Sequence, residues 1–257
     1  MRVYLLLFLI GCSDYAMTHK VVEYVEPEDL HDPNIIVTPS DIDFGHLISG
    51  SEIGSTKFSI ANAGQKDLEI SDITLVGDSG FEILSETEYV LENADSVEII
   101  VNYNPETMES KTATIEVSSN DPDEPLTEVS LKGYGDAPVI EVDPKMFNFQ
   151  DIPMQCEEEI SVEVFNNGNL DLKIAGINEY SSLPNDFYFD EMNFFNGQLP
   201  WVIEPNDSLN ISVSYTPKDT VSDTFNLEII SNDPASGVYL TEYYGNGVYS
   251  KTIIDQY

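Results

Sequence analysis

The chain has 257 residues, of which 41% are hydrophobic and 11% aromatic, so it can bury the core of one large domain or two smaller ones. It carries 47 acidic and 10 basic residues, which gives a formal net charge of -37 at pH 7. Because binding to nucleic-acid phosphates or to anionic lipid headgroups requires clustered Lys and Arg, this balance excludes DNA, RNA and an electrostatic membrane contact.

Residues 1–11 have the pattern of a bacterial signal peptide. Arg2 supplies the positive charge, and the apolar run VYLLLFLI that follows is too short to span a bilayer, which takes roughly 20 apolar residues. The next letters, LIGC, resemble the lipobox of bacterial lipoproteins, with Ile10 where Ala or Ser is commoner. The resemblance implies that Cys12 is lipidated. The alternative is an ordinary signal peptide followed by a chance cysteine.

A lipid on Cys12 predicts an exported protein anchored in the bacterial cell envelope. Burial of acyl chains contributes ~0.8 kcal/mol per methylene, so several chains make the anchor permanent. Ser13 after the cysteine favours the outer membrane over the inner one, although Asp14 weakens this inference. Residues 12–33 are then the lipidated cysteine and an acidic linker. Cys156 is left without an intrachain partner, and we interpret it as a small buried apolar thiol.

Residues 34–136 and 137–248 are predicted to be two copies of one domain. PSDIDFG, beginning at Pro39, pairs with PKMFNFQ, beginning at Pro144. VEIIVNYNP pairs with LNISVSYTP, and the two SNDP motifs are separated by the same number of residues as this pair. Small insertions change the offset in other parts of the chain. A nearly constant offset is typical of a duplicated domain. The second copy has its extra residues between Ile177 and Leu209.

Each copy alternates apolar and polar residues, as a strand with one buried face does. The apolar set Val97, Ile99, Val101 and Tyr103 is one example, and no stretch shows a sustained helical period. About seven short strands per copy, separated by turn residues, predict an all-β protein of two tandem seven-stranded Ig-like sandwiches. Residues 249–257 remain as a short C-terminal tail.

The order of the motifs carries a family resemblance over Asn34 to Val248. A proline followed by DFG or NFQ, then N-x-G before L-x-I-x-x-I, Y-x-P, SNDP and a final G-x-G resembles the ASH (ASPM–SPD-2–Hydin) family. Its bacterial members are often called choice-of-anchor D proteins. Gln150 stands where glycine is expected. The resemblance implies a seven-stranded, PapD-like sandwich used for scaffolding and protein contacts, without catalytic residues.

The motifs that would indicate an enzyme are missing from the sequence. It contains no G-x-S-x-G, H-E-x-x-H, P-loop or Cys-x-x-Cys pattern, and its three histidines, His19, His31 and His46, all precede the second copy. We therefore expect no catalytic residues, no cofactor and no resident metal.

Acidic turns are the remaining candidates for ion binding. Asp41 and Asp43 lie two residues apart, and Asp121, Asp123 and Glu124 cluster at the SNDP turn. Calcium prefers several such oxygens on one loop, but the chain has no D-x-D-x-D-G loop.

The segment from Tyr180 to Trp201 is rich in aromatic residues. Phe187, Phe189 and Trp201 match apolar positions of the first copy and are predicted to be core residues. Phe194 and Phe195 have no counterpart, and we regard them as a candidate interaction patch. The alternative is that these two rings fold back and cap the sandwich.

The sequence thus predicts a monomeric, non-catalytic scaffold or adhesion-type module that contacts protein partners of unknown identity and reaches the membrane through its lipid anchor. The alternative is a calcium- or glycan-binding Ig-like module that uses the acidic loops or the aromatic insertion.

Overall fold

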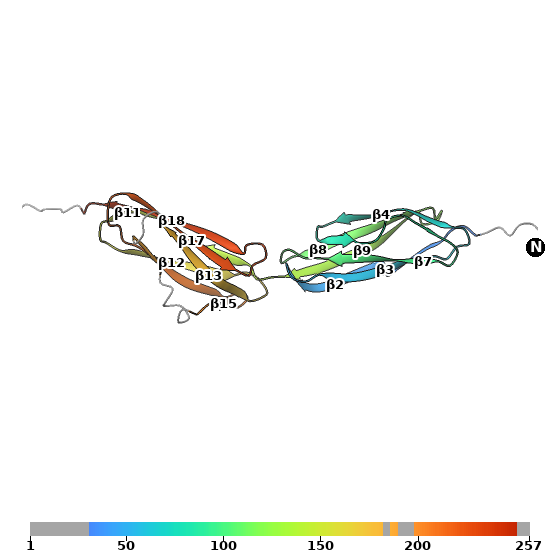
Figure 1. Cartoon of the computed structure of the whole chain (residues 1–257), viewed down its shortest axis with the longest axis horizontal. Helices are drawn as coiled ribbons and strands as arrows, with labels where there is room; N and C mark the ends of the chain where they lie inside the picture. Colours follow the sequence, from blue (N-terminus) through green and yellow to red (C-terminus); the bar gives the residue numbers. More distant parts are fainter. Residues whose placement is uncertain (1–30, 182–185, 190–197, 251–257) are drawn as a thin grey trace, which may run out of the picture. The chain divides into compact units, whose positions relative to one another are not determined.

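The computed structural model describes residues 31–181, 186–189 and 198–250 as strands joined by turns (Figure 1). Strands β1–β9 build one sandwich and strands β10–β18 build a second one. The predicted all-β fold of two tandem Ig-like sandwiches is confirmed. None of the described segments forms a helix with the length and hydropathy needed to cross a membrane.

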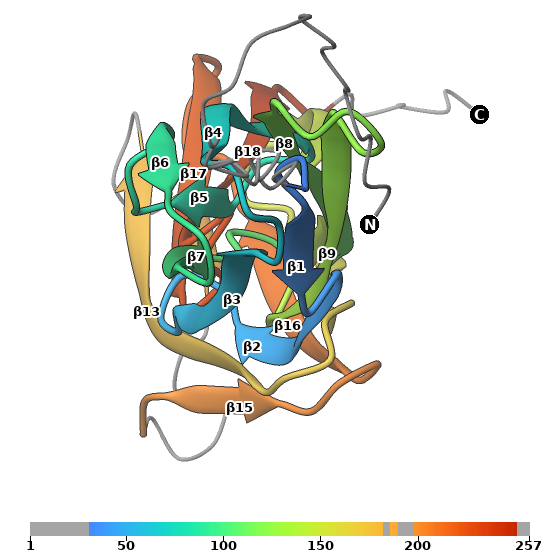
Figure 2. The ribbon, with the colours of Figure 1, turned by 90° about the vertical axis from the view of Figure 1, so that its right-hand side faces the viewer.

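The first sandwich consists of a four-stranded and a five-stranded sheet. Figure 2 shows it end-on, with the strands of the smaller sheet labelled. That sheet has the order β1-β3-β7-β5, from β1 (Ile35–Thr38), β3 (Gly54–Asn62), β7 (Ser96–Tyr103) and β5 (Phe81–Ile83). The larger sheet has the order β2-β9-β8-β4-β6, from β2 (Asp41–Ile48), β9 (Leu126–Asp136), β8 (Ser110–Ser119), β4 (Leu68–Gly77) and β6 (Tyr89–Leu91).

The second sandwich repeats this topology strand for strand. Its smaller sheet has the order β10-β12-β16-β14, from β10 (Ile140–Asp143), β12 (Glu158–Asn166), β16 (Ser208–Tyr215) and β14 (Phe187–Phe189). Its larger sheet has the order β11-β18-β17-β13-β15, from β11 (Met146–Pro153), β18 (Val238–Val248), β17 (Ser222–Ser231), β13 (Leu172–Ser181) and β15 (Trp201–Ile203). In both sandwiches the first strand of the larger sheet pairs in parallel, and every other pairing is antiparallel.

Each sandwich has nine described strands, where the alternation of apolar residues indicates about seven. The shortest strands of each sandwich are β1, β5 and β6 and their counterparts, which have three or four residues each. A strand that short has too few positions to show a period of two.

The two cores contain equivalent aromatic pairs. Phe81 stacks on Tyr103 and Phe187 stacks on Tyr215, with ring centroids 4.5 Å apart in both cases. Each ring sits among buried aliphatic side chains of the facing sheet. Full burial of one such side chain contributes ~1.5–3 kcal/mol, so these positions anchor both domains.

The DFG and NFQ motifs form a bulge in the parallel edge strand of each larger sheet. The strand register shifts between Asp43 and His46, and again between Asn148 and Asp151. The Asp43 and Asn148 side chains each accept a hydrogen bond from the backbone N–H two residues on, at 2.8 Å. The phenylalanine of each motif turns its ring toward the core. The ring centroid of Phe44, for example, lies 5.6 Å from that of Tyr103.

The asparagine of each N-x-G motif is buried and links its own turn to the end of a neighbouring short strand, β6 or β15. Asn62 Nδ2 donates to the carbonyls of Lys66 and Leu91, both at 2.9 Å, and its Oδ1 accepts from Gly64 N at 2.9 Å. Asn166 makes the equivalent bonds in the second sandwich. A buried amide needs such partners, and here they fix the loops at one end of the sandwich.

The aspartate of each SNDP motif fastens the first strand of its own domain. Asp121 Oδ2 accepts from Ile35 N at 2.8 Å, and Asp233 Oδ2 accepts from Ile140 N at 3.0 Å. The other oxygen of each carboxylate caps its own turn. The motif recurs because in each sandwich its aspartate hydrogen-bonds the first strand and so joins the two ends of the domain.

Candidate functional site

Three residues that the sequence singled out, Cys12, Phe194 and Phe195, lie outside the described residues. The core aromatics are confirmed, because Phe187, Phe189 and Trp201 are all buried.

In the acidic turn of the first sandwich, the Asp121 carboxylate is taken up by hydrogen bonds that stabilise the fold. Asp121 is buried, which opposes its ionisation, but the N–H groups of Ile35, Asp123 and Glu124 outweigh burial and hold its pKa below the usual range. Its oxygens are therefore committed to backbone donors. Among the described residues, no three acidic, histidine or cysteine side chains form a group that could hold a metal ion.

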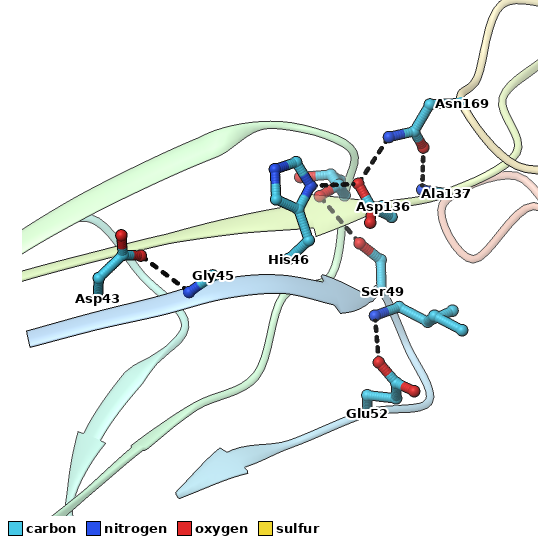
Figure 3. A network of polar contacts seen from close by, with 10 residues as sticks. Asp43, Gly45, His46, Ser49, Glu52, Asp136, Ala137 and Asn169 are labelled. Carbon is cyan, nitrogen blue, oxygen red and sulfur yellow. Dashed lines mark hydrogen bonds and ion pairs between the residues drawn. The ribbon is translucent and has the colours of Figure 1, made fainter. Parts of the chain in front are cut away.

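His46 belongs to a network around Asp136, the last residue of β9 (Figure 3). Its Nδ1 lies 2.9 Å from Asp136 Oδ1, which also accepts a hydrogen bond from Asn169 Nδ2 at 2.6 Å. Asn169 Oδ1 in turn accepts from Ala137 N at 2.9 Å. These bonds satisfy the polar groups of the segment that connects the two sandwiches.

The prediction for Cys156 is wrong, because its side chain is exposed rather than buried. It lies in the turn after β11, where Cys156 N donates to Pro153 O at 2.9 Å and Gln155 has a φ of 66°. The turn points the thiol away from the apolar interior.

The second sandwich contains a buried hydrogen bond between a tyrosine and an aspartate that the first one lacks. Tyr215 Oη donates to Asp223 Oδ2 at 2.8 Å, and Asp223 is only 1% exposed. Burial is the main cause that raises the pKa of Asp223, and the charges of Asp186 and Asp219 raise it further. The hydrogen bond from Tyr215 lowers this pKa but does not cancel the increase. Lys218 Nζ lies 3.4 Å from Asp186 Oδ1 and partly balances the cluster.

The outer face of the larger sheet of the second sandwich carries a surface feature with the composition of a binding site. An open hollow of about 560 Å³ lies over β11, β13, β17 and β18. Its lining residues are Lys145, Met146, Tyr180, Asn226, Glu228, Leu240, Thr241 and Glu242.

Strand pairing places these side chains in two rows across the sheet. In the first row, Tyr180 pairs with Asn226, and Asn226 pairs with Glu242. Met146 extends this row, because it pairs with Glu242 on the other side. In the next row Glu228 pairs with Leu240. Adjacent strands lie ~4.8 Å apart, so the hollow spans four strands and polar groups occupy its middle.

The apolar members of this hollow are unusually open to solvent. Tyr180 is 53% exposed, Leu240 56% and Met146 58%. An aromatic ring and two aliphatic chains grouped on one sheet face mark an interaction surface more often than isolated exposed residues do.

The first sandwich has no such group at the equivalent positions. Strand pairing there joins Val76 to Thr114, Thr114 to Ser130, and Asp41 to Ser130. Tyr180 is thus replaced by Val76 and Met146 by Asp41, while Glu128 takes the place of Leu240. The aromatic and aliphatic character of the hollow belongs to the second sandwich. The sequence pattern does not indicate this hollow, because Met146 and Tyr180 lie far along the chain from Leu240 and meet it only through strand pairing.

Taken together, the strand order and paired sheets define the class of Ig-like β-sandwich domains. Residues 33–134, which cover the first sandwich, match the family model described as "HYDIN/CFA65/VesB-like, Ig-like domain". The match agrees, over the first sandwich, with the ASH-type Ig-like domain that the motif order predicts. Among curated proteins, no sequence matches the chain.

Several solved structures are similar to the chain. A protein of unknown function from Porphyromonas gingivalis W83 has 14% identity and a TM-score of 0.34, and the match covers 82% of this chain and 99% of that one. The ASH/PapD-like domain 7 of human CEP192 has 12% identity and a TM-score of 0.33, covering 45% and 89%. The class 5 fimbriae chaperone CfaA has 11% identity and a TM-score of 0.33, covering 82% and 99%.

Proposed function

We propose that the chain is a non-catalytic protein-interaction module of the bacterial cell envelope, attached to a membrane through a lipid on Cys12. The outer face of the second sandwich is its contact surface, and the first sandwich is a spacer of the same fold. The observation that carries the proposal is the exposed group of Tyr180, Leu240 and Met146, which the first sandwich replaces with smaller or charged residues.

Photo-crosslinking in intact cells tests the contact surface. Replacing Tyr180 with the photoreactive residue benzoylphenylalanine should give a discrete adduct on irradiation. The matched control puts the same residue at Val76, which holds the equivalent position on β4. An adduct of equal yield at both positions, or none at Tyr180, contradicts the proposed surface.

The anchor is tested separately by Cys12→Ser. Lipidation attaches acyl chains to the cysteine thiol, so the variant should move to the soluble fraction or remain unprocessed. Cys156→Ser, which changes the other cysteine of the chain, is the control and should stay with the membrane. A Cys12→Ser protein that is processed and retained normally contradicts the lipid anchor.

A calcium-binding role is less well supported, because the Asp121 carboxylate is used by three backbone donors. A glycan-binding role would use the same hollow as the proposed protein contact. The experiments below include it as a competing outcome.

A further inference from the structure

The hollow on the second sandwich holds two carboxylates, those of Glu228 and Glu242. Glu228 pairs with Leu240 on β18, and Glu242 lies two residues further along that strand. Diagonal neighbours of this kind are ~7–8 Å apart, so one charged group could lie between them. In the described part of the chain, neither Glu228 nor Glu242 forms an ion pair.

The surrounding contacts preserve this negative charge. Glu228 Oε1 accepts a hydrogen bond from Asn178 Nδ2 at 2.9 Å, which orients the carboxylate without neutralising it. Lys145 is the basic residue of the lining, but its Nζ lies over the Tyr239 ring, 5.1 Å from the centroid. The hollow therefore faces solvent with an unbalanced negative charge.

The apolar members suit a long cationic side chain. Tyr180 offers an exposed ring on which a planar guanidinium can stack, with the cation attracted to the ring face. Leu240 and Met146 can cover the aliphatic part of such a side chain. Asn226 lies between Tyr180 and Glu242 in the same row, and its amide oxygen can accept an N–H.

We propose that this hollow binds an arginine side chain presented by a basic segment of the partner protein. The inference rests on the proposed function, since it names the chemistry of the partner at the same surface. Charge complementarity supports the choice, because a chain with a net charge of -37 attracts cationic segments and repels anionic ones. A neutral sugar could stack on Tyr180 but would not need two unpaired carboxylates.

The test uses the 15N-labelled full-length chain and a peptide with a single charge. Acetyl-Gly-Gly-Arg-Gly-Gly-amide is titrated in about 0.15 M sodium chloride, where screening suppresses diffuse attraction to the acidic surface. We expect its amide shift changes to centre on β17, β18 and the end of β13 around Tyr180. The same peptide with citrulline in place of arginine keeps the shape but loses the charge, and its affinity should be lower by about tenfold.

Variants identify the groups responsible. Glu228→Gln combined with Glu242→Gln should weaken arginine binding by about tenfold. The control, Glu116→Gln combined with Glu128→Gln, removes the same charge from the equivalent face of the first sandwich and should change the affinity less than about twofold. Tyr180→Val introduces the residue type that the first sandwich has at the equivalent position, Val76. This variant should also weaken binding of the arginine peptide, while the rest of the spectrum is preserved.

Three results would overturn the inference. One is equal binding of the arginine and citrulline peptides, and another is an equal loss with both glutamine pairs. The third is a neutral oligosaccharide such as cellotetraose that shifts the same amides when the arginine peptide does not. If the adduct at Tyr180 forms in cells but the arginine peptide fails, the interaction surface stands and its chemistry is wrong. If the peptide maps to the hollow but no adduct forms, the site stands and the proposed function fails.

Discussion

The buried carboxyl group of Asp223 makes the stability of the second sandwich depend on pH. Its Oδ2 accepts from Tyr215, but within the described residues its Oδ1 has no hydrogen-bond partner. Burial raises the pKa of Asp223 above the value it has in the unfolded chain. The folded state therefore holds this proton more tightly, and stability falls as pH rises from the unfolded pKa, ~3.9, to the folded one. Above that range the loss is complete.

Asp223→Asn should remove this loss. The amide keeps an acceptor for Tyr215 and carries no charge, so it avoids both the burial of a carboxylate and the repulsion from the charges of Asp186 and Asp219. A buried unsatisfied polar group costs on the order of 1 kcal/mol or more, so at neutral pH the variant should melt at least a few degrees higher. The difference should shrink as the pH falls from the folded pKa of Asp223 to the unfolded one, and it should stay small below that. Calorimetric melting curves at a series of pH values measure both effects.

Asp123→Asn is the matched control, because it removes one exposed carboxylate from the same acidic chain. It should change the melting temperature little at any pH. A gain of equal size in both variants would mean that general charge reduction, and not the burial of Asp223, sets the stability.

At single residues, sequence correspondence predicts burial but not polar partners. Phe187, Phe189 and Trp201 could be assigned to the core, because the first copy has apolar residues in those places. The bond between Tyr215 and Asp223 could not be found in this way. In the first sandwich Lys111 occupies the position of Asp223, and Tyr103 Oη has no partner among the described residues. Cys156 was misjudged for a related reason, because a turn conformation leaves no periodic signal.

Among the structural elements, the bulge of the parallel edge strand offers a direct comparison between the two copies. Gly45 has a φ of 68° and Gln150 has a φ of 65°, so both occupy the left-handed region. A Cβ added at Gly45 would meet nothing within 4 Å, so the cost of a side chain there comes from the backbone alone. For a residue other than glycine this conformation costs roughly 1–2 kcal/mol.

Gln150→Gly should therefore stabilise the second sandwich, and Gly45→Gln should destabilise the first. Glycine gives back roughly 0.5–1 kcal/mol through the flexibility of the unfolded chain, so the net effect at each site is about 0.5–1 kcal/mol. Urea unfolding with domain-specific amide hydrogen exchange measures the two effects separately. A stabilising Gly45→Gln, or a Gln150→Gly that lowers stability, would show that the Gln150 side chain makes compensating contacts.

Elements with a strong alternation were predicted well, whereas the hollow depends on pairing across distant strands. The strands around Tyr103 and Tyr215 have clear apolar faces. Met146 and Glu242 are far apart in the chain and meet only through the parallel pairing of β11 and β18. The outward positions of a strand have no burial pattern, so sequence periodicity cannot indicate which of them form a surface together.

For the whole molecule, the acidic composition predicts how stability responds to salt. With 47 acidic and 10 basic residues, most carboxylates have no cation to pair with, although some pairs form, such as Lys111 with Glu109 at 2.8 Å. Repulsion among the remaining carboxylates opposes the compact state. The few exposed ion pairs contribute little each and would weaken as salt is added. Added salt therefore stabilises the fold by screening the repulsion and destabilises it by weakening the ion pairs. The excess of acidic residues makes the first effect the larger one.

We therefore expect the melting temperature to rise with sodium chloride at neutral pH, and most of the rise should occur at low concentration. The Debye length falls from ~30 Å at 0.01 M to ~8 Å at 0.15 M, so repulsion between neighbouring carboxylates is largely screened within that interval. Magnesium chloride should act at lower concentrations because a divalent cation screens more strongly. A rise confined to concentrations above this interval would indicate salting-out of apolar surface instead. A flat or falling curve would mean that carboxylate repulsion does not limit stability.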